Sequence, residues 1–254
     1  MPQEQKKAAR TPGSGFWSAV SFRWKPHKSR RKRTINLEDL SLKLLQTSTA
    51  DYACALAIYE DRFDEKLRVD TDIITRLVLD KQDDREVLPY GLYDGNQVVG
   101  FCLLTRYNKE RFIYADYISI AKEVGSYGVG KTFLRRMEEE VQRLTNTFVL
   151  FEAEAGALVR FYRALGAGTV DYMHIMPVMD MTLERVPGKV MIFPKPESID
   201  RDRYLECLSA MLFKGYTDWV TLSLSPEDAV RYQQYIADLY DELKDLIPEA
   251  VRVL

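Results

Sequence analysis

The sequence predicts a mixed α/β fold: a twisted, mainly antiparallel sheet with helices on both faces, followed by a helical extension. Three stretches support this prediction. Residues 90–107 read as a β-hairpin, residues 113–140 as a strand, a glycine turn and a helix, and residues 198–247 as helices. Because a hairpin precedes the strand and its glycine turn, a purely parallel sheet is excluded.

The composition is that of a soluble globular protein. Of the 254 residues 46% are hydrophobic and 29% charged, and no apolar run is long enough to span a membrane. The three cysteines, Cys54, Cys102 and Cys207, lie far apart and are odd in number, which favours free thiols in the cytoplasm. With two histidines and no zinc-like spacing, we expect no metal site.

Charge divides the chain into a basic arm and an acidic body. Residues 1–34 contain ten lysines and arginines against Glu4 alone, a net charge of +9, so the remainder carries −11 of the total of −2. We expect this arm to be disordered. Two interpretations stay open: its basic run at residues 27–33 contacts nucleic acid or an anionic surface, or the arm is a solvated tail.

The body is expected to contain a core at residues 35–185 and an extension at residues 186–254. Within residues 35–68, apolar side chains such as Leu56, Tyr59 and Phe63 recur at helical spacing, with Thr49 or Asp51 as the N-cap. Residues 70–79 read as a second short helix. The hairpin that follows turns at Asp94-Gly95-Asn96, residue types that tolerate the positive φ of a tight turn.

Strands and helices alternate after the glycine turn. Residues 131–145 read as an amphipathic helix, 148–154 as a strand, and 157–165 as a short helix ended by Gly166. Residues 170–176 and 178–183 would be the last strands of the core, with Pro177 at a bend. In the extension, residues 190–193 read as a strand and 198–213 as a helix, and Ser225-Pro226 begins a long helix.

The glycine turn itself is typical of an anion site. Gly125, Gly128 and Gly130 stand between an apolar strand and a helix, so backbone N–H groups without helical partners point at one spot. Gly125 to Thr132 also matches G-x-x-x-x-G-K-T, the phosphate loop of nucleotide triphosphatases. The preceding strand is aromatic and half polar instead of continuously aliphatic, which argues against that interpretation. A phosphotransferase remains a remote alternative.

Residues 125–130 resemble the coenzyme loop Gln/Arg-x-x-Gly-x-Gly/Ala of the GNAT superfamily of N-acetyltransferases, with Gly125 in place of the usual Gln or Arg. Residues 159–167 resemble the family's Phe-Tyr-x-x-Leu-Gly-Phe element, about thirty residues downstream. The asparagine that the family has before this helix is absent, since the region reads Glu154-Ala155-Gly156. The resemblance covers roughly residues 36–185 and implies a GNAT-like fold that uses acetyl-CoA.

The resemblance also implies roles for individual residues. Tyr162 would act as general acid toward the sulfur of coenzyme A. Asp116 or Glu152 would be the base, unless an ordered water serves; the family's strands part between them to admit the thioester. By the two-residue period, we expect Tyr114, Asp116, Ile118 and Ile120 to share one face of their strand. Coenzyme contacts are expected from Ile118, Ser119, Ile120, Gly125, Ser126, Tyr127, Gly128, Val129, Gly130 and Lys131.

Two hypotheses for the function follow. In the first, the chain is an acetyl-CoA-dependent N-acetyltransferase that acts by direct attack of an amine, with a small-molecule acceptor favoured over a protein. In the second, it is a catalytically inactive acyl-CoA-binding or interaction module, which the departures at Gly125 and before the short helix favour. The sequence leaves the acyl chain and the oligomeric state open, a homodimer included.

Overall fold

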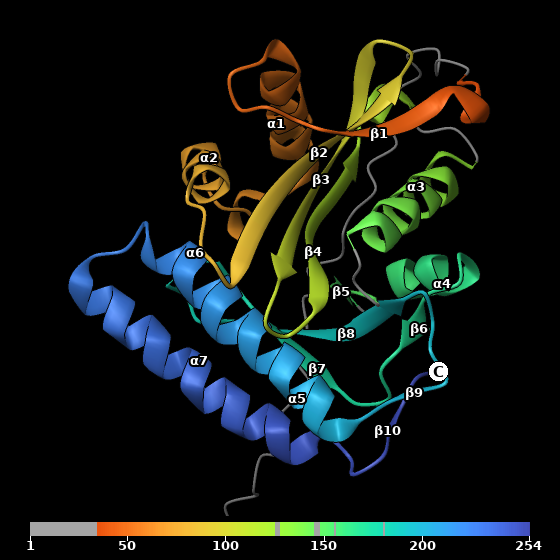
Figure 1. The fold of residues 1–254 in the computed structure, drawn as a ribbon. Helices are drawn as coiled ribbons and strands as arrows, with labels where there is room; N and C mark the ends of the chain where they lie inside the picture. The colour runs from red at the N-terminus through yellow and green to blue at the C-terminus, as the bar shows by residue number, and fades with distance from the viewer. Residues whose placement is uncertain (1–34, 125–127, 145–147, 155, 180) are drawn as a thin grey trace, which may run out of the picture. The chain divides into compact units, whose positions relative to one another are not determined.

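The computed structural model describes residues 35–254 except 125–127, 145–147, 155 and 180. The arm expected at residues 1–34 lies outside the described residues. Residues 35–254 fall within a single structural unit, whose elements are drawn in Figure 1. Its strands are β1 (Leu40–Leu44), β2 (Arg85–Asp94), β3 (Gln97–Tyr107), β4 (Phe112–Ile120), β5 (Val149–Glu154), β6 (Gly168–Thr169), β7 (His174–Pro177), β8 (Arg185–Phe193), β9 (Ser198–Ile199) and β10 (Val251–Arg252).

Helices alternate with these strands along the chain. The α-helices are α1 (Ala50–Arg62), α2 (Thr71–Leu79), α3 (Val129–Arg143), α4 (Ala157–Ala164), α5 (Arg201–Ser209), α6 (Thr217–Thr221) and α7 (Pro226–Leu246). Shorter turns are η1 (Leu37–Asp39), η2 (Glu65–Leu67) and η3 (Lys122–Val124), and η4 (Ala210–Tyr216) is a π-helix.

The main sheet has the strand order β1-β2-β3-β4-β5-β8-β6, and β7 pairs with β8. Among these pairs β4 and β5 run parallel and the others antiparallel. A parallel pair needs a crossover, which the segment containing α3 supplies. The predicted class, a mainly antiparallel sheet with helices on both faces, is confirmed, and Figure 1 shows α3 and α4 on the side of the sheet away from α1 and α2.

The two faces of the sheet have separate cores. One, which we call the glycine-turn face, packs side chains such as Cys102, Ile118 and Phe151 against α3 and α4. The other, which we call the carboxylate face because Asp116 and Glu152 lie on it, packs against α1, α2 and the C-terminal helices. Sequestering apolar area on both faces is what stabilises a sheet buried between two helical layers.

Several local predictions are confirmed. Thr49 caps α1 by accepting from Tyr52 N–H, and Ser225 caps α7 with Pro226 in its first turn. The hairpin of β2 and β3 turns at Gly95, whose φ is 62°. Gly166, at φ 98°, follows α4 as its C-terminal signal predicted.

Residues 40–44, expected to belong to a helix, form strand β1 instead. The alternation of Leu40, Leu42 and Leu44 with polar residues fits a strand as well as a helix over so short a stretch. Hydrogen bonding to β2, with Leu40 opposite Asp94, decides between them. Tertiary pairing therefore overrides the local pattern.

The end of the expected core also differs. Residues 178, 179 and 181–183 form no strand, whereas β8 begins at Arg185 and lies between β5 and β6. The core sheet therefore continues past the expected boundary at residue 185, and β8 is part of it. Pro187 and Gly188 disguise this strand in the sequence, because both residues are rare inside strands.

The helix expected at residues 198–213 begins later and runs further, through α5, η4 and α6. Figure 1 shows these three as one rod with α7 beside it. The wide turns of η4 fall in the middle of the rod. π-Helical turns are rare and recur at functional sites.

Candidate active site

β4 and β5 part soon after they meet. They pair only at Ile113 with Val149 and at Tyr114 with Leu150. Beyond these pairs β4 follows β3 and β5 follows β8 to its last residue, Glu154. Diverging strands leave backbone N–H and C=O groups without partners along their facing edges. This gap is where the resemblance places an acyl thioester.

The edge of β4 offers two N–H groups to the gap. Ala121 N–H donates to Val99 O at 2.9 Å, on the β3 side. Because successive N–H groups of a strand alternate between its two edges, those of Ile118 and Ile120 point away from β3. By the same alternation the N–H of Ser119 points toward β3, so of the three predicted contacts only the two isoleucines present a donor to the gap.

Asp116 occupies a β-bulge in β4. Leu103 on β3 pairs with Tyr117, whereas the next residue, Leu104, pairs with Ala115. Asp116 is therefore an extra residue without a partner on β3. A bulge of this kind bends the strand and re-aims the side chains that follow it. Here it lies on the stretch of β4 that runs beside the gap.

The bulge makes one prediction wrong. Tyr114, Asp116, Ile118 and Ile120 do not share a face, because one extra residue moves every later side chain to the opposite face. Tyr114 and Asp116 lie on the carboxylate face, and the two isoleucines pack on the glycine-turn face. The gap therefore opens onto carboxylates at one face of the sheet and onto apolar side chains at the other.

Asp116 is a carboxyl group with weak stabilisation of its charge. The hydroxyl of Thr105 donates to Asp116 Oδ2 at 2.7 Å. Burial raises the pKa of Asp116 to about 8, and the hydrogen bond from Thr105 and the charge of Arg85 offset the rise only in part. The negative charge of Glu152 raises it further. A carboxyl group with this pKa can exchange a proton near neutral pH.

Glu152, in contrast, is held in its ionised form. Tyr114 OH donates to Glu152 Oε2 at 2.6 Å, Tyr216 OH donates to the same oxygen, and His174 Nε2 contacts Oε1. Burial acts to raise the pKa of Glu152, but the charge and hydrogen bond of His174 and the two phenols outweigh it, so the pKa is lowered. With its side chain 5% exposed, Glu152 is a buried anion with a partner on each oxygen.

Tyr162 lies on the other side of the gap. It projects from α4 into the glycine-turn face, where its ring meets that of Phe151 edge-on with centroids 4.7 Å apart. Its hydroxyl has no hydrogen-bond partner among the described residues. Burial raises the pKa of Tyr162 to about 12, so the phenol stays protonated and can donate. The structure thus separates Tyr162 from the two carboxylates that the sequence grouped with it.

The glycine turn is described in part. Gly125, Ser126 and Tyr127, three of the expected contacts, lie outside the described residues. Gly128 is the N-cap of α3, with the left-handed φ of 98°, and the first turn of α3 contains no acidic side chain. Thr132 N–H closes the first helical bond to Gly128 O. The N–H groups of Val129 to Lys131 therefore precede the helical ladder and are open to an anion.

Close packing at this turn also requires glycine. A Cβ on Gly130 would lie 2.8 Å from the tip of the Phe161 ring, so the chain passes closely here only because the residue is glycine. Lys131 is exposed beside the open amides. Open backbone amides with a nearby ammonium suit the diphosphate of a coenzyme, and these residues would hold it.

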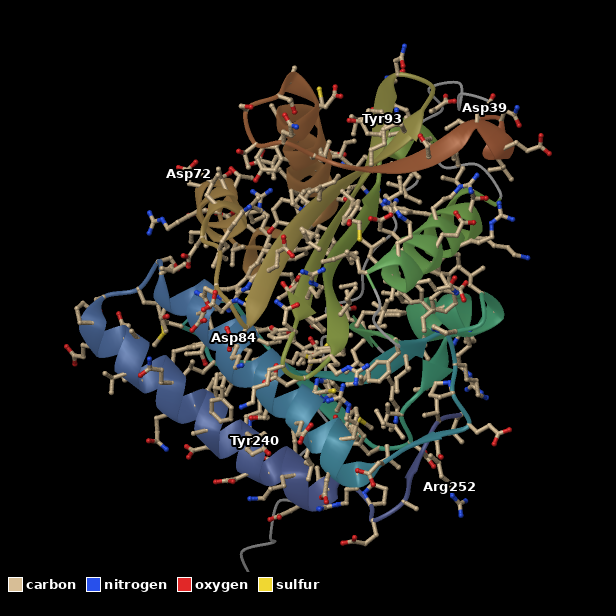
Figure 2. The ribbon with its side chains drawn as sticks, in the orientation of Figure 1. Asp39, Asp72, Asp84, Tyr93, Tyr240 and Arg252 are labelled. Carbon is tan, nitrogen blue, oxygen red and sulfur yellow. The ribbon has the colours of Figure 1, made fainter. Side chains whose placement is uncertain are left out.

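The C-terminal rod covers the carboxylate face. The buried guanidinium of Arg85 donates to Lys214 O and to Asp218 Oδ2, the latter at 2.8 Å. Lys214 Nζ reaches Asp84 at 2.5 Å and Glu110 at 3.0 Å. Figure 2 shows Asp84 where the start of β2 meets this rod. The extension is therefore fastened to the sheet by charge pairs as well as apolar packing.

η4 brings side chains directly onto the carboxylates. Tyr216 donates to Glu152, and Gly215 approaches Tyr107 so closely that a Cβ would lie 2.9 Å from the phenol oxygen. The next turn places the buried Trp219 against the same face. Residues of the extension thus form part of the site, which the division into a core and an extension did not anticipate.

Sequence reasoning missed the partners of Glu152. His174 entered only as one of two histidines too few for a metal site, and Tyr114 and Tyr216 were not assigned to the site. Tyr216 lies 64 residues from Glu152 along the chain. Within residues 170–176 the polar His174 interrupts an otherwise strand-like pattern, which is the one signal that could have singled it out.

Two classes of feature are absent from the described part of the chain. It contains no group of three or more His, Cys, Asp or Glu side chains that could hold a metal ion. Within the same residues, no helix has the length and apolar character to cross a membrane.

Residues 55–167 match the family model of the acetyltransferase (GNAT) family. None of the curated proteins matches the chain in sequence. Among solved structures, a protein from Bacteroides thetaiotaomicron assigned to the GNAT family of acetyltransferases is 14% identical, with a TM-score of 0.56 over 68% of this chain and 98% of its own. At that identity the likeness shows the fold.

Two further solved structures are more distant. A GNAT acetyltransferase from Elizabethkingia anophelis with acetyl-CoA bound is 11% identical, with a TM-score of 0.43 over 61% of this chain and 97% of its own. A variant of spermidine N-acetyltransferase from Vibrio cholerae is 14% identical, with a TM-score of 0.49 over 61% and 94%. The family model and the fold agree with the parted strands and the glycine turn: residues 55–167 match the GNAT acetyltransferase family, and the sheet around them has a GNAT-like fold.

Proposed function

We propose that the chain is an acetyl-CoA-dependent N-acetyltransferase in which an amine attacks the thioester directly. The observation that carries this proposal is the gap between β4 and β5, which has carboxylates on one face and Tyr162 on the other. Bound acetyl-CoA supplies the thioester. A donor entering from the glycine-turn face and an acceptor entering from the carboxylate face would meet in the gap.

The backbone supplies the donor site. The open N–H groups of Val129 to Lys131 would hold the diphosphate at the positive end of α3. The N–H groups of Ile118 and Ile120 would donate to the acetyl carbonyl oxygen as it gains negative charge. Fixed backbone donors stabilise such charge without having to reorganise, which makes them a large contributor to catalysis.

The two carboxylates divide the work on the acceptor. Their pKa values are pushed in opposite directions, which separates the roles of paired acids. Asp116, with a pKa of about 8, would accept the proton that the amine must lose before attack. Glu152, which stays ionised, would attract the acceptor's ammonium to the gap.

Tyr162 would complete the transfer from the other face. Its phenol is protonated at neutral pH and has no partner among the described residues, so it is free to donate to the departing sulfur. Its distance from Asp116 across the sheet keeps acid and base from neutralising each other.

The acceptor is proposed to be a small amine. η4 and α6 lie over Glu152 and Arg85 on the carboxylate face, so a bulky acceptor would have to displace charge-paired side chains. A compact ammonium bearing a short chain avoids that cost. Glu152 further favours acceptors that are cationic before they react.

The test has a binding arm and a turnover arm. Calorimetry with acetyl-CoA and with free coenzyme A measures donor binding, and thiol release then reports transfer to a panel of monoamines, polyamines and amino acids. We expect binding of both coenzymes and thiol release with at least one acceptor. Binding without release for any amine would instead support an inactive acyl-CoA-binding module. Magnesium-dependent ATP binding with no affinity for acetyl-CoA would contradict both.

A further inference from the structure

We propose that His174 is a positioning residue that, backed by Tyr172 and Tyr204, holds Glu152 as an oriented anion at the gap. The inference rests on the proposed function, because it explains how the carboxylate that attracts the acceptor is kept ionised and oriented. His174 itself touches neither donor nor acceptor. It acts through Glu152.

The contacts form a continuous chain behind Glu152. His174 is fully buried and its Nε2 meets Glu152 Oε1. On the other side of the ring, Nδ1 lies 2.8 Å from Tyr172 OH, which lies 2.9 Å from Tyr204 OH. Tyr172 and Tyr204 are both buried, so water does not compete for these groups.

Counting hydrogens shows that His174 donates to Glu152. An ionised carboxylate only accepts, so His174 Nε2 must carry a hydrogen. With neutral His174, Nδ1 accepts from Tyr172 OH, which in turn accepts from Tyr204 OH, and every hydrogen has an acceptor. With protonated His174, both tyrosines turn round and the Tyr204 hydrogen loses its acceptor within the described residues. In both states Nε2–H points at Glu152.

The remaining oxygen of Glu152 is fixed from two other elements. Tyr114 on β4 and Tyr216 on η4 donate to Oε2. If only these two donors bound the carboxylate, both at Oε2, Oε1 would be buried without a partner. This is costly for an ionised group. His174 supplies that partner, so it decides both the charge and the direction of the carboxylate.

Other groups bear on the same carboxylate. Asp116 on β4 is a neighbouring acid whose own pKa is raised by the charge of Glu152. Lys189 on β8 anchors the middle of the chain, since its ammonium donates to the backbone carbonyl of Tyr172 at 2.6 Å. The titratable and charged groups around Glu152 are thus Tyr114, Asp116, Tyr172, His174, Lys189, Tyr204 and Tyr216.

A purely structural role for His174 predicts different behaviour from a positioning role. If the histidine only fills the core, its replacement lowers stability and activity alike at every pH. If it keeps Glu152 ionised, its loss lets burial raise the pKa of Glu152, and the activity lost near neutral pH returns as the pH rises. The KM for the acceptor would change, and the KM for acetyl-CoA would not.

The experiment compares four variants with the wild-type chain. His174→Phe removes both ring hydrogen bonds, and His174→Gln keeps an amide donor for Glu152. Tyr172→Phe removes the support of Nδ1 and the partner of Tyr204 OH, and leaves the contact of His174 with Glu152 in place. Tyr232→Phe is the matched control, because it also removes a buried tyrosine hydroxyl from the same core, one that donates to Val178 O at 2.9 Å. For each variant, kcat/KM is measured from pH 6 to 10 together with thermal stability.

We expect His174→Phe to lower kcat/KM for the acceptor about ten- to a hundredfold at pH 7, the range of a lost hydrogen bond to a buried charge. The loss should shrink toward pH 10. His174→Gln should restore part of the activity, Tyr172→Phe should lose a few-fold, and Tyr232→Phe should affect stability alone. A pH-independent loss in His174→Phe, or none, would overturn the proposal.

A second measurement needs no turnover and so separates this inference from the proposed function. Carbon NMR of labelled glutamate follows the ionisation of the Glu152 carboxyl, with Glu152→Gln assigning its signal. We expect the carboxyl to remain ionised at pH 7 in the wild-type chain and to titrate at higher pH in His174→Phe, which removes both ring hydrogen bonds. The same titration in both proteins would overturn the role of His174, even if some amine is acetylated.

Discussion

The two faces of the sheet at the β4–β5 gap are assembled in different ways. The glycine-turn face draws Gly128, Gly130 and Tyr162 from elements that follow one another along the chain. The carboxylate face gathers around Glu152 three partners from β4, β7 and η4, at separations of 38, 22 and 64 residues. The first arrangement is a local motif and the second a product of the whole fold.

The faces also differ in their chemistry. Around Tyr162 the side chains are apolar, and backbone amides provide the polar groups. Around Glu152 they are phenols, a histidine and a second carboxyl group. The coenzyme portion of the donor is recognised by backbone groups and by shape, whereas the acceptor is recognised by side chains. Specificity should therefore change through the carboxylate face without disturbing coenzyme binding.

The largest effect expected from this comparison is that of Asp116→Asn. Asparagine keeps the shape and can still accept from Thr105 but cannot take a proton. Because a base acts in its ionised form, wild-type kcat/KM should rise with pH up to about 8 and then level. We expect the variant to lose about 10²- to 10⁴-fold at pH 9 and to lose this rise. The measurement is the pH profile of thiol release at saturating acetyl-CoA.

The acceptor's own amine provides the control for this profile. Two acceptors whose amine pKa values differ should show the same apparent pKa if it belongs to Asp116. An apparent pKa that follows the acceptor would remove Asp116 from the role of base and leave an ordered water.

The pH dependence of stability should be opposite to that of activity. The pKa of Asp116 is about 8 in the folded chain against an ordinary 3.8, so between these values the folded state binds more protons than the unfolded one. Its contribution to the free energy of unfolding therefore falls as pH rises through that window. Asparagine removes the fall, so the variant should gain stability relative to wild type at pH 9 and not at pH 4.

The same contrast explains what the sequence could predict. The glycine turn, the Phe-Tyr element and the hairpin are contiguous, so spacing and turn chemistry alone indicate them. Asp116 and Glu152 were identified as acids, but the bulge that turns Ile118 and Ile120 to the other face was not, since the sequence pattern does not reveal one unpaired residue in a strand. His174 and Tyr216 reach the site only through β7 and η4, whose positions long-range packing determines.

An intermediate effect is expected on the other face, from Tyr162→Phe. The leaving thiol of coenzyme A resembles a cysteine thiol, with a pKa near 8.5, so it departs readily and needs only modest help. We therefore expect turnover to fall about tenfold, less than the roughly 10²- to 10⁴-fold typical of general acids. Since burial raises the pKa of Tyr162 to about 12, the loss should be greatest at high pH, where free protons are scarce.

Calorimetry distinguishes this role from packing. The dissociation constant for acetyl-CoA should change less than turnover, because phenylalanine preserves the ring contact with Phe151. Turnover that is unchanged in Tyr162→Phe would exclude the hydroxyl from the mechanism. A loss confined to coenzyme affinity would make it a binding group.

The smallest effect is expected from Gly128→Ala at the N-cap of α3. Gly128 has φ 98°, which costs an alanine about 1 kcal/mol or more. Its new Cβ would meet the end of the Leu37 side chain at 2.8 Å, and that flexible side chain can move aside. We expect stability to fall by about 1 to 2 kcal/mol in urea unfolding. Affinity for coenzyme A should fall a few-fold, because the strained turn re-aims the open amides.

Gly95→Ala is the matched control for this variant. Gly95 also has a positive φ, 62°, and a Cβ there meets no atom within 4 Å. It lies at the tip of the β2–β3 hairpin, in a different element from the α3 turn. Its stability should fall by a similar amount while calorimetry with coenzyme A stays at the wild-type value. Equal losses of affinity in both variants would mean that affinity follows global stability and not the amides past Gly128.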